Sequence, residues 1–146
     1  MNAPFETPVF HLYAVCASLV VVLLFALAFY TAAFRGKVKT FVNPEDKALD
    51  KEGVISDMEH SAVQRAKRAH LNLLESAVPF FVVGLLYAAT NPSLGVAQAL
   101  FGTFVAARVL HAIFYLLAKQ PFRTLSFVVG SGVVLAMTEE VLRAAL

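Results

Sequence analysis

The sequence predicts an all-α integral membrane protein built as a bundle of four transmembrane helices, and two observations carry this prediction. Hydrophobic residues make up 59% of the 146 residues and charged residues only 15%, and the mean hydropathy is +0.71, values outside ordinary globular usage. The run 12–34 contains 23 residues without a charge, more than the roughly 20 that a helix needs to cross a hydrocarbon core. Residues 1–146 therefore form a single membrane domain.

The first helix is expected over about residues 8–35. A basic flank of Arg35, Lys37 and Lys39 follows its apolar run, whereas no Lys or Arg precedes the run. A cleaved signal peptide has the opposite arrangement and a shorter apolar core, so we interpret the segment as a retained anchor helix. The single cysteine, Cys16, lies within it, so no intramolecular disulfide can form.

Three more apolar segments predict helices over about 61–90, 93–118 and 122–144, separated by the turn signals NPSLG and KQP. Eight of the twelve Lys and Arg residues lie between the first two helices or at their ends, and two more flank the third connection. The positive-inside rule therefore predicts that the first and third connections are cytoplasmic and that both termini lie on the other side. A bacterial inner membrane and the endoplasmic reticulum both fit this orientation.

The first connection, about 36–60, is the only long one. Its length is typical of a functional segment, although a solvated loop with a short helix explains it equally well. The net charge is only +2, and acidic residues are interleaved with the basic ones. A nucleic-acid-binding surface is therefore not indicated.

A polar stripe is predicted on the second helix. Arg65, Arg68, Asn72 and Glu75 are spaced 3, 4 and 3 residues apart, so they fall within a sector of roughly 80°. Snorkelling to lipid headgroups explains the two arginines. Glu75 lies about two turns further into the apolar run, where a charge is costly unless it is paired.

A second polar stripe, Arg108, His111 and Tyr115, is predicted on the third helix. Arg108 lies near the middle of its segment, so we expect it to form a buried ion pair with Glu75. Such a pair could serve only to fasten the bundle. The additional amide, imidazole and phenol of Asn72, His111 and Tyr115 favour a binding site for a small polar ligand.

Arg123 and Thr124 are expected in the first turn of the fourth helix, just after Pro121. Unpaired backbone N–H groups and the helix dipole favour an anion there. The alternative is an arginine that only snorkels to the interface. The guanidinium with the neighbouring hydroxyl suits a carboxylate or a thiolate.

Four segments together resemble the MAPEG family, membrane-associated proteins in eicosanoid and glutathione metabolism. They are FVNPED (41–46), RAKRAHLNLLESAVPF (65–80), ARVLHAIFYL (107–116) and PFRTLSFVVGSGVVLAM (121–137). The resemblance implies a homotrimer of four-helix protomers that binds glutathione between subunits near the cytoplasmic side. It also implies the following glutathione-binding residues: Lys39, Arg68, Asn72, Glu75, His111, Tyr115 and Arg123.

Within that resemblance, Arg123 would stabilise the glutathione thiolate with Thr124 as a hydroxyl donor, and Arg108 would pair with Glu75. No metal is expected. Lys39 corresponds only loosely to a family arginine contributed by the neighbouring subunit.

The motifs AHLN, GLLY and LSFVVGSG look closer to microsomal glutathione transferase than to prostaglandin E synthase. Leu71 and Phe127 stand where that synthase carries an arginine and a tyrosine, and Ser131 stands where the mammalian transferase carries a tyrosine. The implied function is thiolate attack on lipophilic electrophiles, with reduction of lipid hydroperoxides as a further activity. The alternatives are a glutathione-dependent isomerase of the prostaglandin E synthase type and a non-catalytic membrane scaffold.

Overall fold

The structure is a computed structural model that describes residues 6–48 and 50–146. The described part contains four long helices: α1 (Pro8–Val38), α2 (Ser61–Ala89), α3 (Leu94–Leu116) and α4 (Phe122–Ala145). All four are long and apolar enough to cross a membrane. The predicted fold class, a four-helix membrane bundle, is therefore confirmed, whereas the homotrimer stays a prediction. The helices begin and end within about three residues of the expected bounds.

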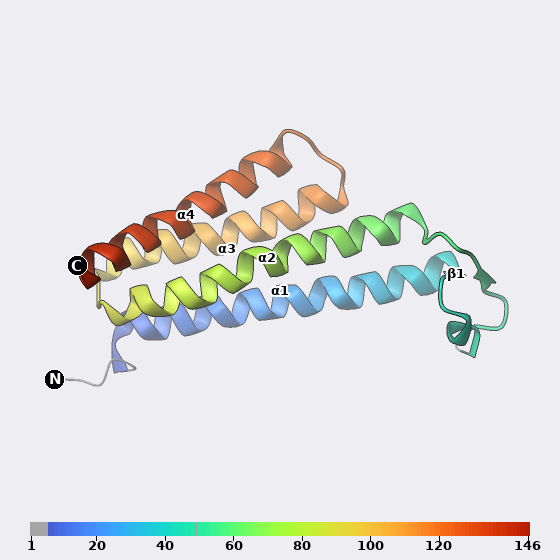
Figure 1. Cartoon of the computed structure of the whole chain (residues 1–146), viewed down its shortest axis with the longest axis horizontal. Helices are drawn as coiled ribbons and strands as arrows, with labels where there is room; N and C mark the ends of the chain where they lie inside the picture. The colour runs from blue at the N-terminus through green and yellow to red at the C-terminus, as the bar shows by residue number, and fades with distance from the viewer. Residues whose placement is uncertain (1–5, 49) are drawn as a thin grey trace.

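The four helices run alternately in opposite directions along the long axis of the molecule (Figure 1). The start of α1 and the end of α4 consequently lie at one end of the bundle. The long α1–α2 connection and the α3–α4 connection lie at the other, which we call the loop end. This arrangement brings the basic residues that flank both connections to the same end.

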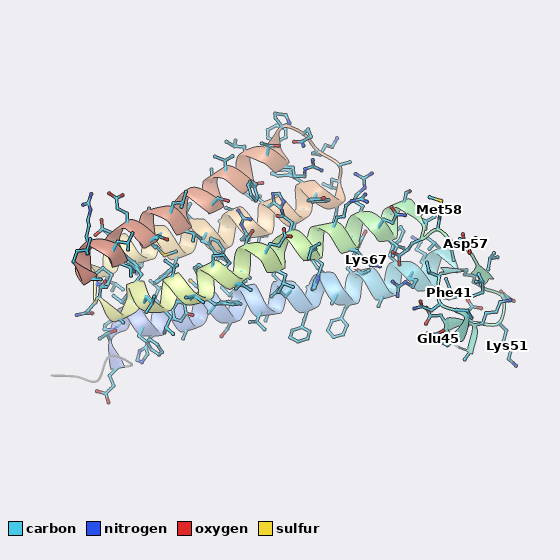
Figure 2. All side chains as sticks on the ribbon, in the orientation of Figure 1. Phe41, Glu45, Lys51, Asp57, Met58 and Lys67 are labelled. Carbon is cyan, nitrogen blue, oxygen red and sulfur yellow. The ribbon has the colours of Figure 1, made fainter. Side chains whose placement is uncertain are left out.

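The α1–α2 connection starts later than expected because α1 continues to Val38, where Lys39 ends it in the left-handed conformation with φ of 50°. It then forms a short parallel ladder between β1 (Thr40–Phe41) and β2 (Val54–Ile55), with the 3₁₀ helix η2 (Pro44–Ala48) between them. Residue 49 lies outside the described residues. Figure 2 shows this folded connection beyond the ends of α1 and α2.

An aromatic cluster joins α1, α2 and α3. The rings of Phe80 and Phe104 stack with centroids 4.0 Å apart, and Tyr13 donates a hydrogen bond of 2.8 Å to the carbonyl oxygen of Phe81. Gly84 lets the Tyr13 ring approach, since a Cβ there would lie 3.0 Å from it. Packing of this kind fixes how α2 is rotated about its axis, and so which of its side chains face α3.

Large apolar side chains cover the outside of the bundle, among them Phe29 and Leu135, which are 71% and 68% exposed. In water such a surface would be unstable, whereas in a bilayer it is the expected one. The chain is a multi-pass integral membrane protein.

Candidate functional site

Arg108 holds the centre of the bundle together. Its side chain on α3 is buried, with 1% exposed, and donates to Ser76 Oγ on α2 at 2.7 Å. Its second terminal nitrogen donates to two α4 carbonyl oxygens, those of Phe127 at 2.9 Å and Ser126 at 3.3 Å. The rings of Phe104 and Phe127 lie 5.5 Å from the guanidinium carbon. One side chain thereby connects three helices.

The expected ion pair between Glu75 and Arg108 is not formed within the chain. Among the described residues the ion pairs do not include Glu75, whose side chain is exposed on the protomer. Its neighbour Ser76 faces Arg108 instead, because successive helical residues point about 100° apart. The helical spacing predicted Glu75 as the α2 partner of Arg108, whereas within one chain the α2 side chain that Arg108 contacts is Ser76.

Gly130 makes room for the Arg108 guanidinium. A Cβ at this position of α4 would lie 2.1 Å from the Arg108 terminal nitrogen and 2.6 Å from Nε. Any larger residue must therefore displace the guanidinium from the α4 carbonyl oxygens that it contacts. Gly130 is the first residue of the sequence motif GSG, but helical spacing alone does not show which side chain this glycine accommodates.

Five of the predicted site residues meet in one pocket at the loop end. This Arg123 pocket has a volume of about 270 Å³, and Phe127 completes its wall. Its lining residues are Asn72, His111, Tyr115, Arg123, Thr124 and Phe127. Three helices contribute to it, so the pocket depends on the packing of α2, α3 and α4.

The Arg123 guanidinium is held by neutral groups. Its carbon lies 4.7 Å from the centroid of the Tyr115 ring, a cation–π contact. The amide of Gln120, with its oxygen toward Arg123, accepts from Nε at 3.2 Å and from a terminal nitrogen at 2.6 Å, while its nitrogen donates to Thr124 Oγ1 at 3.0 Å. This amide orientation is the physically sound one, because a guanidinium only donates. Sequence reasoning missed Gln120, whose position before Pro121 gave no signal.

His111 is buried beneath the same pocket, with 5% exposed. Its Nδ1 lies 2.9 Å from the carbonyl oxygen of Arg123. A carbonyl oxygen only accepts, so Nδ1 carries the proton and Nε2 keeps its lone pair. Nε2 has no partner among the described residues, and the same is true of Asn72 Oδ1. Both atoms are buried acceptors, and buried polar atoms normally have partners, so each lacks a donor. Among the described residues, Arg108 Nε likewise has no partner.

A second pocket, the Glu75 pocket, adjoins the first. It has a volume of about 410 Å³ and shares Asn72 and Phe127 with the Arg123 pocket. Glu75, Ser131 and mostly apolar side chains of α2, α3 and α4 form the rest of its wall. Phe127 therefore separates a pocket lined by a cation from one lined largely by hydrocarbon.

Arg68 lies in neither of these pockets. It lines a pocket of about 440 Å³ between α1 and α2, the basic pocket, together with Arg35, Lys67 and His70. Figure 2 labels Lys67 near the start of α2, close to the folded connection. Arg35 was not among the predicted site residues. Its place at the end of the first apolar run indicates only the flank of a membrane helix, although its side chain lines the same pocket as Arg68.

Lys39 lies apart from all three pockets. Its ammonium pairs with Glu52 at 2.6 Å and Asp50 at 3.6 Å in the exposed connection. The hydrogen bond to Glu52, helped by the charge of Asp50, raises the pKa of Lys39. Within one chain, Arg35 is the α1 side chain directed toward the polar stripe of α2, and Lys39 belongs to the loop.

The described residues contain no group of three or more His, Cys, Asp or Glu side chains placed to hold a metal ion. The arrangement instead offers two cationic pockets and one apolar pocket around the loop-end half of α2. These three pockets together can bind a small anion that carries several polar groups, with an apolar molecule next to it.

Comparisons with known proteins identify the family of the chain. The family model described as MAPEG family matches residues 13–142. Microsomal glutathione S-transferase 1 of Bos taurus is 39% identical over 145 residues, covering 97% of this chain and 94% of the relative. The protein of that name from Homo sapiens is 38% identical over the same coverage. Prostaglandin E synthase of Equus caballus is 35% identical over 119 residues, covering 81% of this chain and 77% of the relative.

The match extends through all four membrane helices and includes every residue of the Arg123 pocket. The chain belongs to the MAPEG family.

Proposed function

We propose that the protein is a membrane-bound glutathione transferase. The observation that carries the proposal is the Arg123 pocket, where a guanidinium bonded only to neutral partners lies beside two buried polar atoms without partners. An anion can pair with the guanidinium, and N–H donors on the same molecule can satisfy His111 Nε2 and Asn72 Oδ1. The names of the relatives, microsomal glutathione S-transferase 1, support glutathione as that anion.

The chemistry required of the pocket is to stabilise a thiolate. A thiol with the ordinary pKa of cysteine, about 8.5, is mostly protonated at neutral pH, and the thiolate is the nucleophile. A guanidinium beside the sulfur stabilises the anion and lowers its pKa, by about one unit for each 1.4 kcal/mol of preferential stabilisation. Arg123 supplies this charge, and the Thr124 hydroxyl donates a hydrogen bond to the sulfur. The thiolate then forms a bond to the electrophilic carbon, and the leaving group departs with its electron pair.

Glutathione binding is assigned to the polar stripe. Asn72 and His111 lie in the Arg123 pocket, Glu75 in the adjoining pocket and Arg68 in the basic pocket, and Tyr115 both lines the first pocket and packs on Arg123. Glu75 is suited to the ammonium of glutathione, and Arg68 to a carboxylate. Lys39 is too far along the connection to join them in one chain, so its contribution would come from a neighbouring protomer of the proposed homotrimer.

The second substrate is a lipophilic electrophile that reaches the apolar side of Phe127 from the bilayer. A lipid hydroperoxide is a second candidate: two molecules of glutathione reduce it to the alcohol and water and leave as the disulfide. The positive-inside rule supports a cytoplasmic position for the loop end, which gives the pocket access to soluble glutathione.

A glutathione-dependent isomerase is the second candidate function, favoured by the relatives named prostaglandin E synthase. A non-catalytic scaffold is the third. Calorimetry with glutathione and conjugation of 1-chloro-2,4-dinitrobenzene by the detergent-purified protein distinguish the three. We expect binding and a thioether product. Binding with isomerisation of a prostaglandin endoperoxide but no thioether would favour the isomerase, and absence of binding and product would leave the scaffold.

A further inference from the structure

A carboxylate of the chain itself occupies part of the basic pocket. Glu59, at the end of the α1–α2 connection, accepts from Arg35 on α1 at 2.6 Å and lies 3.0 Å from the Lys67 ammonium on α2. Only 9% of its side chain is exposed. Burial opposes ionisation, but the hydrogen bonds from Lys67 and Arg35 outweigh it and lower the pKa of Glu59. Glu59 is therefore an anion seated between two cations at neutral pH.

These two cations are also lining residues of the basic pocket. The pocket carries three permanent positive charges, Arg35, Lys67 and Arg68, and Arg68 donates only to the neutral amide oxygen of Gln64, at 3.4 Å, among the hydrogen bonds of the described residues. Glu59 neutralises one charge of the three. The pocket has thus the composition of a carboxylate site, and an internal carboxylate already uses part of it.

The basic pocket lies within reach of the Arg123 pocket. Arg68 lines the former and Asn72 the latter, and the two residues are four positions apart on α2, about 6 Å along the helix. The thiol of glutathione is on its central residue, so in the extended tripeptide each carboxylate lies on the order of 6 Å further along the backbone. A molecule with its thiol beside Arg123 can therefore place a carboxylate among the basic side chains.

We propose that Glu59 competes with a carboxylate of glutathione for Arg35 and Lys67, and so sets the affinity of the protein for glutathione. The inference rests on the proposed function. When glutathione arrives, its carboxylate replaces the Glu59 carboxylate at the two cations, and Glu59 moves to solvent with the connection that carries it. Glu59 acts by occupying the site and takes no part in the chemistry at sulfur.

The test measures glutathione affinity by calorimetry, and KM and kcat by conjugation, for the full chain and for Glu59→Gln. The amide keeps the shape of the carboxylate and removes its charge, so Kd and KM should fall by roughly 1.5-fold to fivefold, the range for partly exposed ion pairs, with kcat unchanged. Glu139→Gln is the matched control, because Glu139 pairs with Arg143 on the exposed surface of α4, far from the pocket. It should alter neither constant.

Two monoesters of glutathione, each with one carboxyl group blocked, make the test specific. The gain in Glu59→Gln should persist for one monoester and vanish for the other, which identifies the competing carboxylate. Equal or weaker binding of all three thiols by a Glu59→Gln variant whose unfolding midpoint matches that of the unmodified chain would overturn the inference, as would a gain that persists for both monoesters.

The inference and the proposed function fail in different ways. Unchanged glutathione affinity in Glu59→Gln, with normal conjugation by the unmodified chain, overturns the inference alone. Tighter glutathione binding in Glu59→Gln, with no conjugation by either protein, supports competition by Glu59 but contradicts the transferase function. Absence of glutathione binding in both proteins overturns both.

Discussion

Two arginines lie on neighbouring helices in very different surroundings. Arg108 is buried, and both of its terminal nitrogens donate to groups of the bundle, one to Ser76 and the other to α4 carbonyl oxygens. Arg123 is half-buried at the loop end, packs on the Tyr115 ring and contacts an amide that belongs to its own turn. Neither takes part in the ion pairs of the described residues.

The difference lies in what each guanidinium can still bind. Arg108 has its partners on two other helices, and removing it takes a charged donor from all of them. Arg123 faces a pocket and is held by only one flexible side chain and a ring, so a ligand can replace or share those contacts. Arg108 is the more deeply buried of the two and its hydrogen bonds extend to two other helices, whereas Arg123 is half-buried and lines a pocket.

The largest effect on stability is expected for Arg108→Leu. Loss of Arg108 removes the donor that Ser76 Oγ and the α4 carbonyl oxygens share, and the shorter side chain leaves a cavity. We expect a loss of about 2–4 kcal/mol, measured as a fall of roughly 5–15 °C in the midpoint of thermal unfolding in detergent. Arg123→Leu is the matched control and should shift the midpoint by no more than about 2 °C. Equal shifts in the two variants would remove the distinction between the arginines.

Gly130→Ala should act on the same contact from the other side. The added Cβ meets the Arg108 guanidinium at 2.1 Å, so the side chain must move off the α4 carbonyl oxygens at a cost of about 1–3 kcal/mol. Gly132→Ala is the control, because a Cβ at that position would have nothing within 4 Å of it. Alanine there should be neutral or stabilising by up to about 1 kcal/mol. Similar midpoints for both variants would contradict this packing.

Gln120→Leu tests how Arg123 is positioned. Without the amide oxygen the guanidinium keeps only its Tyr115 contact, so it should spend less time beside the sulfur. The conjugation rate is expected to fall about tenfold, or 1.4 kcal/mol, with little change in the unfolding midpoint. Lys119→Leu, one residue earlier in the same exposed turn, serves as control. An unchanged rate would mean that Gln120 does not position Arg123.

The smallest effect concerns the pH dependence contributed by Glu59. Its pKa is lowered from the ordinary 4.5, so its ion pairs stabilise the fold above that value, and this stabilisation is lost as the pH falls through the lower pKa of the folded chain. We expect the unmodified chain to lose under about 1 kcal/mol more than Glu59→Gln as the pH falls from neutral to below the lowered pKa of Glu59, after solvent screening. If the unfolding midpoints of the two proteins change in parallel with pH, the ion pairs of Glu59 do not contribute to the stability of the bundle.

The fold could be predicted closely from the sequence because membrane helices are read from length and hydropathy, properties of one segment at a time. The convergence of Asn72, His111, Tyr115, Arg123 and Thr124 was also predictable, from helical spacing together with the family resemblance.

The partner of Arg108 was not predictable in this way. Glu75 and Ser76 differ by one position, and only the packing of the aromatic cluster decides how α2 is rotated toward α3. Arg35 and Gln120 were missed for a related reason. Each lies at the end of a helix or in a turn, where spacing rules do not apply and the tertiary structure decides what the side chain faces.

The central claim, that Arg123 is the arginine available to a reacting anion, is tested most directly by the ultraviolet absorbance of the glutathione thiolate in the bound complex. For Arg123→Leu, glutathione affinity should stay within about tenfold, or 1.4 kcal/mol, while the thiolate signal disappears at neutral pH and the conjugation rate falls on the order of a hundredfold. Arg143→Leu, which removes an exposed arginine at the opposite end of the bundle, should keep both. A thiolate signal and rate that survive in Arg123→Leu would contradict the account.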